Sequence, residues 1–137
     1  GETEANSCWF PTIDSPNQKT SQEIYITVPN RFKTLSNGQL INQTQKGTNR
    51  TDYWKLDKKH APYLFFMGVG EYEIIKDTYK NIPVHYYVEK EYAAYAKDIF
   101  GNTPEMIGFF ADNNFLENSF SLLIVSFISS VLFPIIS

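Results

Sequence analysis

The sequence predicts a mainly β fold, an antiparallel sheet assembly followed by short helices. Up to about residue 88, aromatic residues stand among β-branched residues and turn formers, a composition typical of strands. After residue 89, apolar residues recur at helical spacing instead. The 137 residues, of which 42% are hydrophobic and 20% charged, suffice for about one domain with a sizeable core.

The first strand is expected at Glu23–Val28. Its residues Ile24, Ile26 and Val28 alternate with polar or exposed residues, so they share one buried face. Asn-Gly and Lys-Gly sequences mark the turns that follow, because glycine tolerates a positive φ. The next expected elements are a turn at 36–38, a polar exposed strand at 39–44, a turn at 46–49 and an antiparallel partner strand at 51–56.

The second half of the β region is expected to begin with a charged loop over residues 57–62. A continuously apolar run from Tyr63 to Val69 follows, and a short run of this kind predicts a central strand covered on both faces. This strand is expected to continue over residues 71–75, past a bulge at Gly70. A turn at 81–83 then leads into a last strand over 84–88.

Two helices are expected next, and the change of period near Glu89 is a candidate domain boundary. Gly101-Asn102 separates the helices, and Thr103 is expected to cap the second one. Apolar residues form one stripe on the first helix and one side of the second. The stripe on the first helix consists of Tyr92, Tyr95, Ala96, Ile99 and Phe100. The apolar side of the second helix consists of Met106, Phe109 and Phe110.

The C-terminal end is apolar, and Asn118–Ser137 carries no charge. As a helix the apolar part would be about 25 Å long, marginal for a hydrocarbon core of about 30 Å. It lacks flanking Lys or Arg residues, so a buried or aberrant tail is favoured over a membrane span. Deleting residues 115–137 is expected to raise solubility. At the other end, Gly1 and the lack of a signal-peptide pattern suggest that processing or truncation removed the true start.

Residue types and spacing argue against several functions. A net charge of −3 without a basic run excludes a nucleic-acid partner, and a single cysteine, Cys8, excludes an internal disulfide framework. The only histidines, His60 and His85, do not stand at zinc-site spacing. The carboxylate pair Asp52 and Asp57 is expected on a solvated strand face. Spacing alone therefore predicts a β-rich domain without its own active site.

Four segments together resemble the aminopeptidase N-type (gluzincin) zinc metallopeptidases. In that family an acidic residue or Gln precedes a Phe-Pro-Cys-x-Asp-x-Pro run, as Glu2 precedes Phe10 by eight residues here. Thr12 and Ile13 replace residues that are commonly Cys and Phe in the family. The other three segments are 34–38, similar to the family's Ala-Leu-Ser-Asn turn, 61–72, similar to its Tyr-Leu…Val-Gly strand, and 100–105, similar to the start of its catalytic domain.

The resemblance covers roughly residues 1–111 and implies a fragment of such an enzyme. Residues 1–88 would be part of the saddle-like N-terminal β domain, and 89–114 the first helices of the catalytic domain. Residues 115–137 would be an apolar tail whose status the sequence leaves open. The family's Gly-x-Met-Glu-Asn and His-Glu-x-x-His motifs are absent from the 137 residues.

By this resemblance the intact enzyme would remove N-terminal amino acids from peptides with the help of zinc. Glu2 would be the substrate-binding residue for the peptide's α-amino group, and this chain would hold no catalytic or metal-binding residue. Its partners would be the peptide's N-terminus and the missing catalytic domain, and the compartment is left open. The alternatives are a non-catalytic β-rich binding module and a domain tethered to a membrane by its apolar end.

Overall fold

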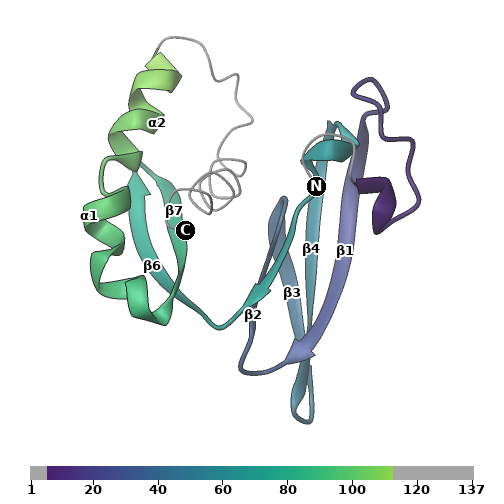
Figure 1. The fold of residues 1–137 in the computed structure, drawn as a ribbon. Coiled ribbons are helices and arrows are strands. Elements are labelled where there is room, and N and C mark those ends of the chain that lie inside the picture. Colours follow the sequence, from purple (N-terminus) through teal and green to yellow (C-terminus); the bar gives the residue numbers. More distant parts are fainter. Residues whose placement is uncertain (1–5, 113–137) are drawn as a thin grey trace. The chain divides into compact units, whose positions relative to one another are not determined.

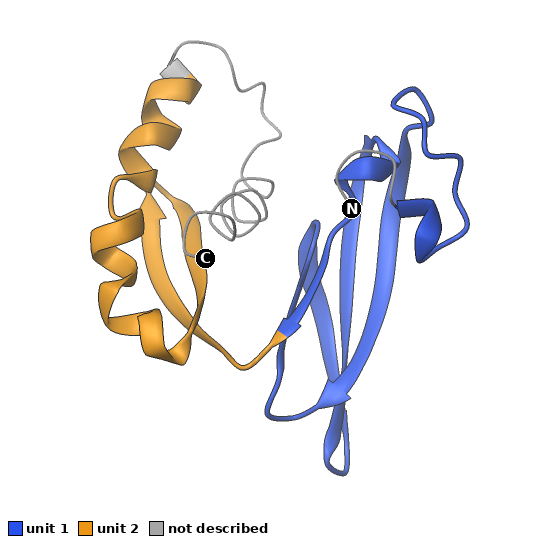
Figure 2. Ribbon diagram, in the orientation of Figure 1, with its two compact units in different colours: residues 1–69 blue, residues 70–137 orange. Residues whose placement is uncertain are grey.

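The structure is a computed structural model that describes residues 6–112, and it confirms the predicted fold class. Antiparallel strand pairs come first in the chain and short helices follow (Figure 1). The chain forms two compact units, unit 1 with residues 1–69 and unit 2 with residues 70–137 (Figure 2). Glu2 and the tail 115–137 lie outside the described residues.

Unit 1 is built on a three-stranded antiparallel sheet. Its central strand is β4 (Asn49–His60), with β1 (Thr20–Pro29) on one side and β3 (Gln39–Lys46) on the other. Ile26 and Val28 of β1 are buried while their neighbours in the strand are exposed, as the alternation predicts. The sheet therefore has one inner face, which positions the polar groups described below.

The predicted exposed strand and the turn after it are confirmed. β3 is exposed along its whole length. Lys46 pairs with Asn49 to close the hairpin between β3 and β4, and Gly47 in the turn has φ of +61°. This is a left-handed conformation that glycine adopts without steric cost. The local turn chemistry thus sets the register of the hairpin.

The charged loop expected over residues 57–62 is wrong, because β4 continues to His60. After a register shift near Gln22, the pairing of β1 with β4 extends to Thr20 opposite His60. The pairing supplies partners for the strand's backbone groups, which outweighs the weak strand preference of a charged run.

The central strand expected over Tyr63–Val69 is also wrong. Pro62–Leu64 form a turn of 3-10 helix (η2), and only the short strand β5 (Met67–Gly70) follows, paired with β2 (Lys33–Ser36). Pro62 has no backbone N–H to give to a sheet. Side chains from distant parts of unit 1 bind the carbonyls of this segment instead, as described below.

Unit 2 consists of a β-hairpin followed by helices. Strands β6 (Tyr72–Tyr79) and β7 (Ile82–Glu89) pair antiparallel, in a sheet separate from β5, so β5 does not continue past a bulge at Gly70 as expected. The chain turns at Lys80, with φ of 53°, and Asn81, so the turn expected at 81–83 starts one residue earlier and ends before Ile82. The helices that follow are η3 (Lys90–Tyr95, 3-10), α1 (Ala96–Phe100) and α2 (Thr103–Asp112).

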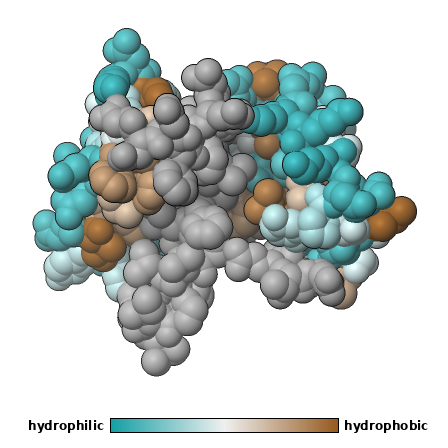
Figure 3. All heavy atoms as spheres, turned by 90° about the horizontal axis from the view of Figure 1, so that it is seen from above, coloured by the Kyte–Doolittle hydropathy of each residue, from teal (hydrophilic) through white to brown (hydrophobic). Residues whose placement is uncertain are grey.

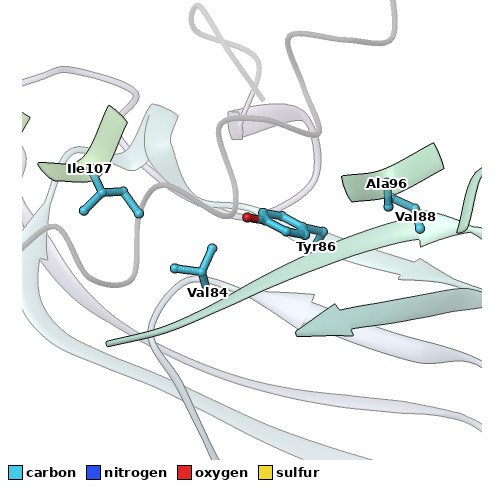
Figure 4. Packing of buried hydrophobic residues seen from close by; sticks show 5 residues of the cluster. All are labelled: Val84, Tyr86, Val88, Ala96 and Ile107. Atoms are coloured by element: carbon cyan, nitrogen blue, oxygen red, sulfur yellow. The ribbon is translucent and has the colours of Figure 1, made fainter. Parts of the chain in front are cut away.

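The core of unit 2 lies between β7 and the helices. Val84, Tyr86 and Val88 of β7 are buried with Ala96 of α1 and Ile107 of α2 (Figure 4). The hairpin and the helices therefore fold as one compact unit that begins at Gly70, before the change of period near Glu89. Assignment of the helices to a catalytic domain stays a prediction.

The apolar stripe predicted for the first helix is only partly buried. Ala96 is buried and Phe100 packs against the core, but Tyr92, Tyr95 and Ile99 are exposed. Residues 90–95 form a 3-10 helix with three residues per turn. Residues spaced for 3.6 residues per turn therefore do not all lie on the side of this helix that faces the core.

The second helix is likewise rotated from the expected orientation. Ile107 of α2 is 9% exposed, whereas Met106 is 55% exposed. The helix rests on the hairpin through Gly108, where an added Cβ would lie 3.1 Å from the ring of Tyr79. A Cβ at this position would require the ring of Tyr79 to shift by a few tenths of an ångström.

The surface of the described residues is mixed. Figure 3 shows separate hydrophobic patches among hydrophilic side chains on the face in view. Among residues 6–112, no helix combines the length and the apolar character that crossing a membrane requires.

Candidate functional site

The candidate site is the N-terminal segment, residues 6–14, and the part of unit 1 that holds it. Glu2, the predicted substrate-binding residue, lies just before this segment and outside the described residues, so its role stays a prediction. The segment starts with a turn of 3-10 helix, η1 (Asn6–Cys8). Its contacts show how residues 6–14 are held in unit 1.

Asn6 is the centre of this anchorage and is fully buried. Its Nδ2 group donates hydrogen bonds to the carbonyl oxygens of Pro62 and, at 3.4 Å, of Phe65. Its Oδ1 accepts a hydrogen bond of 2.8 Å from Nε1 of Trp9. Its backbone N–H donates to Oδ2 of Asp14 at 3.0 Å. A buried amide with both ends bonded tolerates little displacement, because each lost bond leaves a buried polar group unsatisfied.

Aromatic packing supports the same connection. The rings of Phe10 and Phe65 stack with centroids 5.1 Å apart and an interplanar angle of 8°, and Trp9 meets Phe10 edge-on at 4.6 Å. Phe65 also contacts the ring of His60 at the end of β4, at 4.6 Å. Phe65 therefore joins the N-terminal segment to the sheet. Aromatic pairs of this kind contribute about 1 kcal/mol beyond their buried area.

A second asparagine, Asn37, binds residues 64 and 66, next to the carbonyls that Asn6 contacts. Asn37 is 2% exposed, and its Nδ2 donates to the carbonyl of Leu64 at 3.0 Å while its Oδ1 accepts from the N–H of Phe66 at 2.7 Å. Oγ of Ser36 donates to the carbonyl of Phe66 at 2.8 Å. The sequence pattern identified the turn at 36–38 but not this clamp, because its partners stand 27 to 30 residues further along the chain.

His60, at the end of β4 next to Phe65, is a structural residue of unit 1. Its Nε2 lies 3.3 Å from Oε1 of Gln22, and its Nδ1 lies 3.0 Å from the carbonyl of Lys58. Gln22 in turn donates to Ser36 at 3.0 Å. Burial lowers the pKa of His60 and outweighs the opposing hydrogen bond to Lys58. The ring is therefore neutral at pH 7. Its contacts connect the end of β4 to β1 and to Phe65.

A further polar cluster surrounds Asp52 of β4. The expectation that Asp52 is solvated is wrong, because this residue is buried. Asp52 is 1% exposed and accepts hydrogen bonds from Nε of Arg50 at 2.6 Å, Oγ1 of Thr34 at 2.6 Å and Nε2 of Gln43 at 2.9 Å. Burial alone would raise the pKa of Asp52, but these three donors together lower it. Asp57 lies apart and binds Lys55 at 3.0 Å, so the two carboxylates form no acid–base pair.

The described residues do not provide a zinc site. Among residues 6–112, no three His, Cys, Asp or Glu side chains come together in a way that could hold a metal ion. Neither His60 nor His85 stands in such a group. The donor set therefore does not fit the zinc ion that the resemblance implies for the intact enzyme.

Comparison with known protein families supports the resemblance. Residues 1–64 match the family model of the peptidase M1 N-terminal domain. The match includes Glu2, the whole N-terminal segment and the turn at Ser36 to Gly38. No curated protein matches the chain.

Solved structures share the fold. One is a mutant of a two-domain M1 zinc metallopeptidase bound to L-arginine, with 19% identity and a TM-score of 0.51. Another is a mutant M1 zinc metallopeptidase from Deinococcus radiodurans, with 19% identity and a TM-score of 0.50. Each comparison covers 60% of this chain and 20% of the other, so the chain spans about one fifth of the length of these structures.

Proposed function

We propose that the chain is a piece of a zinc-dependent aminopeptidase, because residues 1–64 match the family model of the peptidase M1 N-terminal domain. It comprises the last part of the β domain and the first helices of the catalytic domain. The observation that carries this proposal is the family match, which begins before Glu2 and runs through the sheet of unit 1.

In this proposal unit 1 presents Glu2 to the substrate. A glutamate with an ordinary pKa of about 4.3 is ionised at pH 7, and it accepts charge-assisted hydrogen bonds from the peptide's ammonium group. This contact selects peptides with a free N-terminus and determines which peptide bond reaches the reacting centre. A blocked N-terminus removes both the charge and the donors, so such peptides should be poor substrates.

Zinc and the hydrolytic step come from the remainder of the proposed enzyme, because the described residues lack a metal-binding cluster. The purified 137-residue chain is therefore expected neither to bind zinc tightly nor to release amino acids from peptides. Zinc-dependent hydrolysis by the purified chain would contradict this division of roles. Metal content after dialysis and release of the first amino acid from a tripeptide are the two measurements.

The role of Glu2 is tested in a full-length M1 aminopeptidase with glutamate at this position. Glu2→Ala is expected to lower kcat/KM for a free-N-terminal peptide by at least about tenfold, since a hydrogen bond to a charged group contributes about 1.5–3 kcal/mol. Zinc content should stay the same. Glu2→Gln keeps a hydrogen-bond acceptor but loses the charge, so its kcat/KM should lie between the values for the wild type and Glu2→Ala. Unchanged kinetics in Glu2→Ala would remove Glu2 from the site.

A further inference from the structure

We propose that His60, Gln22 and Ser36 form a proton-operated switch in unit 1, in which the charge of His60 decides whether Ser36 binds the carbonyl of Phe66. The moving part is the side-chain carboxamide of Gln22, which turns over when His60 gains or loses a proton. All four residues lie in the described part of unit 1, so the switch is independent of the proposed function.

These residues form an unbroken chain of polar contacts. Nε2 of His60 lies 3.3 Å from Oε1 of Gln22, and Nε2 of Gln22 lies 3.0 Å from Oγ of Ser36. Oγ of Ser36 in turn lies 2.8 Å from the carbonyl oxygen of Phe66. His60, Gln22 and Ser36 are only 7%, 6% and 3% exposed, so water does not replace a lost contact here. The number of hydrogens in the chain therefore determines which contacts are made.

Both ring nitrogens of His60 face oxygen atoms that accept hydrogen bonds. Nδ1 lies 3.0 Å from the carbonyl oxygen of Lys58, and Nε2 faces Oε1 of Gln22. A neutral imidazole has one N–H and can donate to only one of these oxygens, whereas the imidazolium ion donates to both. With a charged ring every contact is satisfied, because Gln22 then donates to Ser36 and Ser36 donates to Phe66.

A neutral ring requires a different arrangement of the same atoms. With its proton on Nδ1, which has the shorter contact, His60 keeps the bond to Lys58 and presents a lone pair at Nε2. A half turn of the Gln22 carboxamide brings its NH2 group to that lone pair and its oxygen to Ser36. The single hydroxyl hydrogen of Ser36 then goes to Gln22, and the carbonyl of Phe66 loses this donor.

The surroundings of His60 place the change below its ordinary pKa of about 6.5. Burial lowers the pKa, and the hydrogen bond to the carbonyl of Lys58 opposes it. The ring is packed by Gln22 from β1 and Phe65 from the segment after η2, neither of which titrates. The charged residues next to it on β4 and just before β1 are exposed, and they are Asp57, Lys58, Lys59 and Lys19. Among residues 6–112, no charged side chain contributes to the shift of this pKa.

Acidification therefore has opposite local and global effects in unit 1. A charged His60 completes the hydrogen-bond chain and binds Ser36 to the carbonyl of Phe66. The same charge is buried, which lowers the free energy of unfolding of the whole unit. Histidine is suited to such a device because its charge changes near neutral pH.

The switch is tested by NMR spectroscopy of the isotope-labelled 137-residue chain between pH 8 and pH 5. At pH 8 the ring of His60 should carry its proton on Nδ1 and none on Nε2. As His60 becomes charged, nuclear Overhauser contacts of the Gln22 NH2 group should move from the His60 ring to Ser36. The carbonyl carbon signal of Phe66 should shift with the same pH midpoint as the ring of His60.

Three variants separate the switch from a direct effect of the nearby charge. Gln22→Met keeps the length of the side chain without the carboxamide, so the signal of Phe66 should lose its pH response although His60 still titrates. Ser36→Ala should also abolish the response of Phe66, while Gln22 continues to follow His60. His85→Gln is the matched control and should leave every response unchanged, since His85 is not part of the chain of contacts.

Several results would overturn the proposal. A neutral His60 with its proton on Nε2 would do so, because Gln22 could then keep one orientation at every pH. The same holds if the contacts of the Gln22 NH2 group do not change with pH, or if the response of Phe66 persists in Gln22→Met or Ser36→Ala. Should Gln22→Met fail to fold, Ser36→Ala and the position of the His60 proton still decide the question.

Discussion

At the scale of single residues, the stability of unit 1 depends on one buried carboxylate, that of Asp52. It is enclosed by Arg50, Thr34 and Gln43, and the Arg50 pair is bidentate, with Nη2 at 2.8 Å from Oδ2. The same donor set that lowers the pKa of Asp52 would be left unsatisfied without it. Arg50, whose side chain is 14% exposed, would then lose its carboxylate and keep only the hydrogen bond from Nη2 to the carbonyl of Phe32.

We therefore expect Asp52→Asn to lower the free energy of unfolding by about 3 kcal/mol, the usual effect of breaking a buried ion pair. The matched control is Asp57→Asn, whose side chain is 80% exposed and pairs with Lys55. Its effect should stay below about 1 kcal/mol. Urea unfolding followed by tryptophan fluorescence measures both, and equal effects would show that burial of the pair is unimportant.

His60 should make the stability of unit 1 depend on pH. Burial lowers its pKa in the folded state below the unfolded value of about 6.5. The unfolded chain then binds more protons, so this contribution to stability is present above pH 6.5 and is lost as the pH falls through the folded pKa. Urea midpoints between pH 7.5 and 5 should fall more steeply for the wild type than for His60→Gln. Parallel slopes would contradict this.

At the scale of elements, two glycines allow a direct comparison of turns. Gly38 has φ of +91°, and an added Cβ would lie 2.0 Å from the carbonyl oxygen of Lys55 on β4. Gly47 has φ of +61°, and an added Cβ there would meet nothing within 4 Å. Gly47→Ala therefore incurs only backbone strain, of about 1 kcal/mol. Gly38→Ala adds a collision with a backbone that is held in the sheet.

We expect Gly38→Ala to lower the free energy of unfolding by at least about 2 kcal/mol more than Gly47→Ala. Thermal or urea unfolding of the two variants in parallel measures the difference. Equal losses would mean that the turn at Gly38 can shift away from β4 without consequence, and that the observed closeness to Lys55 is not a constraint.

Elements with local causes could be predicted from the sequence, and those with distant causes could not. The alternation of Ile24, Ile26 and Val28 and the turn at Gly47 depend on near neighbours, and both are confirmed. The strand expected from Tyr63 onward failed because Asn6 and Asn37 bind its backbone from far along the chain. For the candidate site, the family signature pointed to Glu2, whose role stays a prediction, and it did not point to Asn6, whose partners no local pattern reveals.

The helix α2 gives a similar comparison inside unit 2. Ile107→Ala is expected to lower the free energy of unfolding by about 2–4 kcal/mol, because it removes a buried side chain from the core formed with β7. Met106→Ala, at an exposed neighbouring position, should change it by no more than about 0.5 kcal/mol. Circular dichroism of the helices measures both, and the reverse order would show that the predicted apolar side is the buried one.

At the scale of the whole molecule, the two units have separate spectroscopic signals. Both tryptophans, Trp9 and Trp54, belong to unit 1, whereas the α-helices of the described residues belong to unit 2. Each unit has its own buried residues, with Ile26, Val28 and Trp54 in unit 1 and the cluster around Tyr86 in unit 2. Domains with separate cores often unfold as separate cooperative units.

We expect Asp52→Asn to shift the fluorescence transition to lower urea concentration while the helical transition seen by circular dichroism stays in place. Ile107→Ala should do the opposite. The two variants act as controls for one another. If each variant moves both transitions equally, the chain unfolds as a single cooperative body despite its two units.

The turn at Asn37 and Gly38 also affects the chemical stability of the chain over time. Asparagine followed by glycine is prone to deamidation, because the unhindered glycine nitrogen can attack the side-chain carbonyl carbon and release ammonia. In the folded chain this carboxamide is 2% exposed and held by Leu64 and Phe66, so the attack is impeded. Each excursion to the unfolded state exposes it. Water then hydrolyses the cyclic imide left by the loss of ammonia to aspartate or isoaspartate, neither of which can donate a hydrogen bond to Leu64. Time spent unfolded would thus accumulate as chemical damage that refolding cannot reverse.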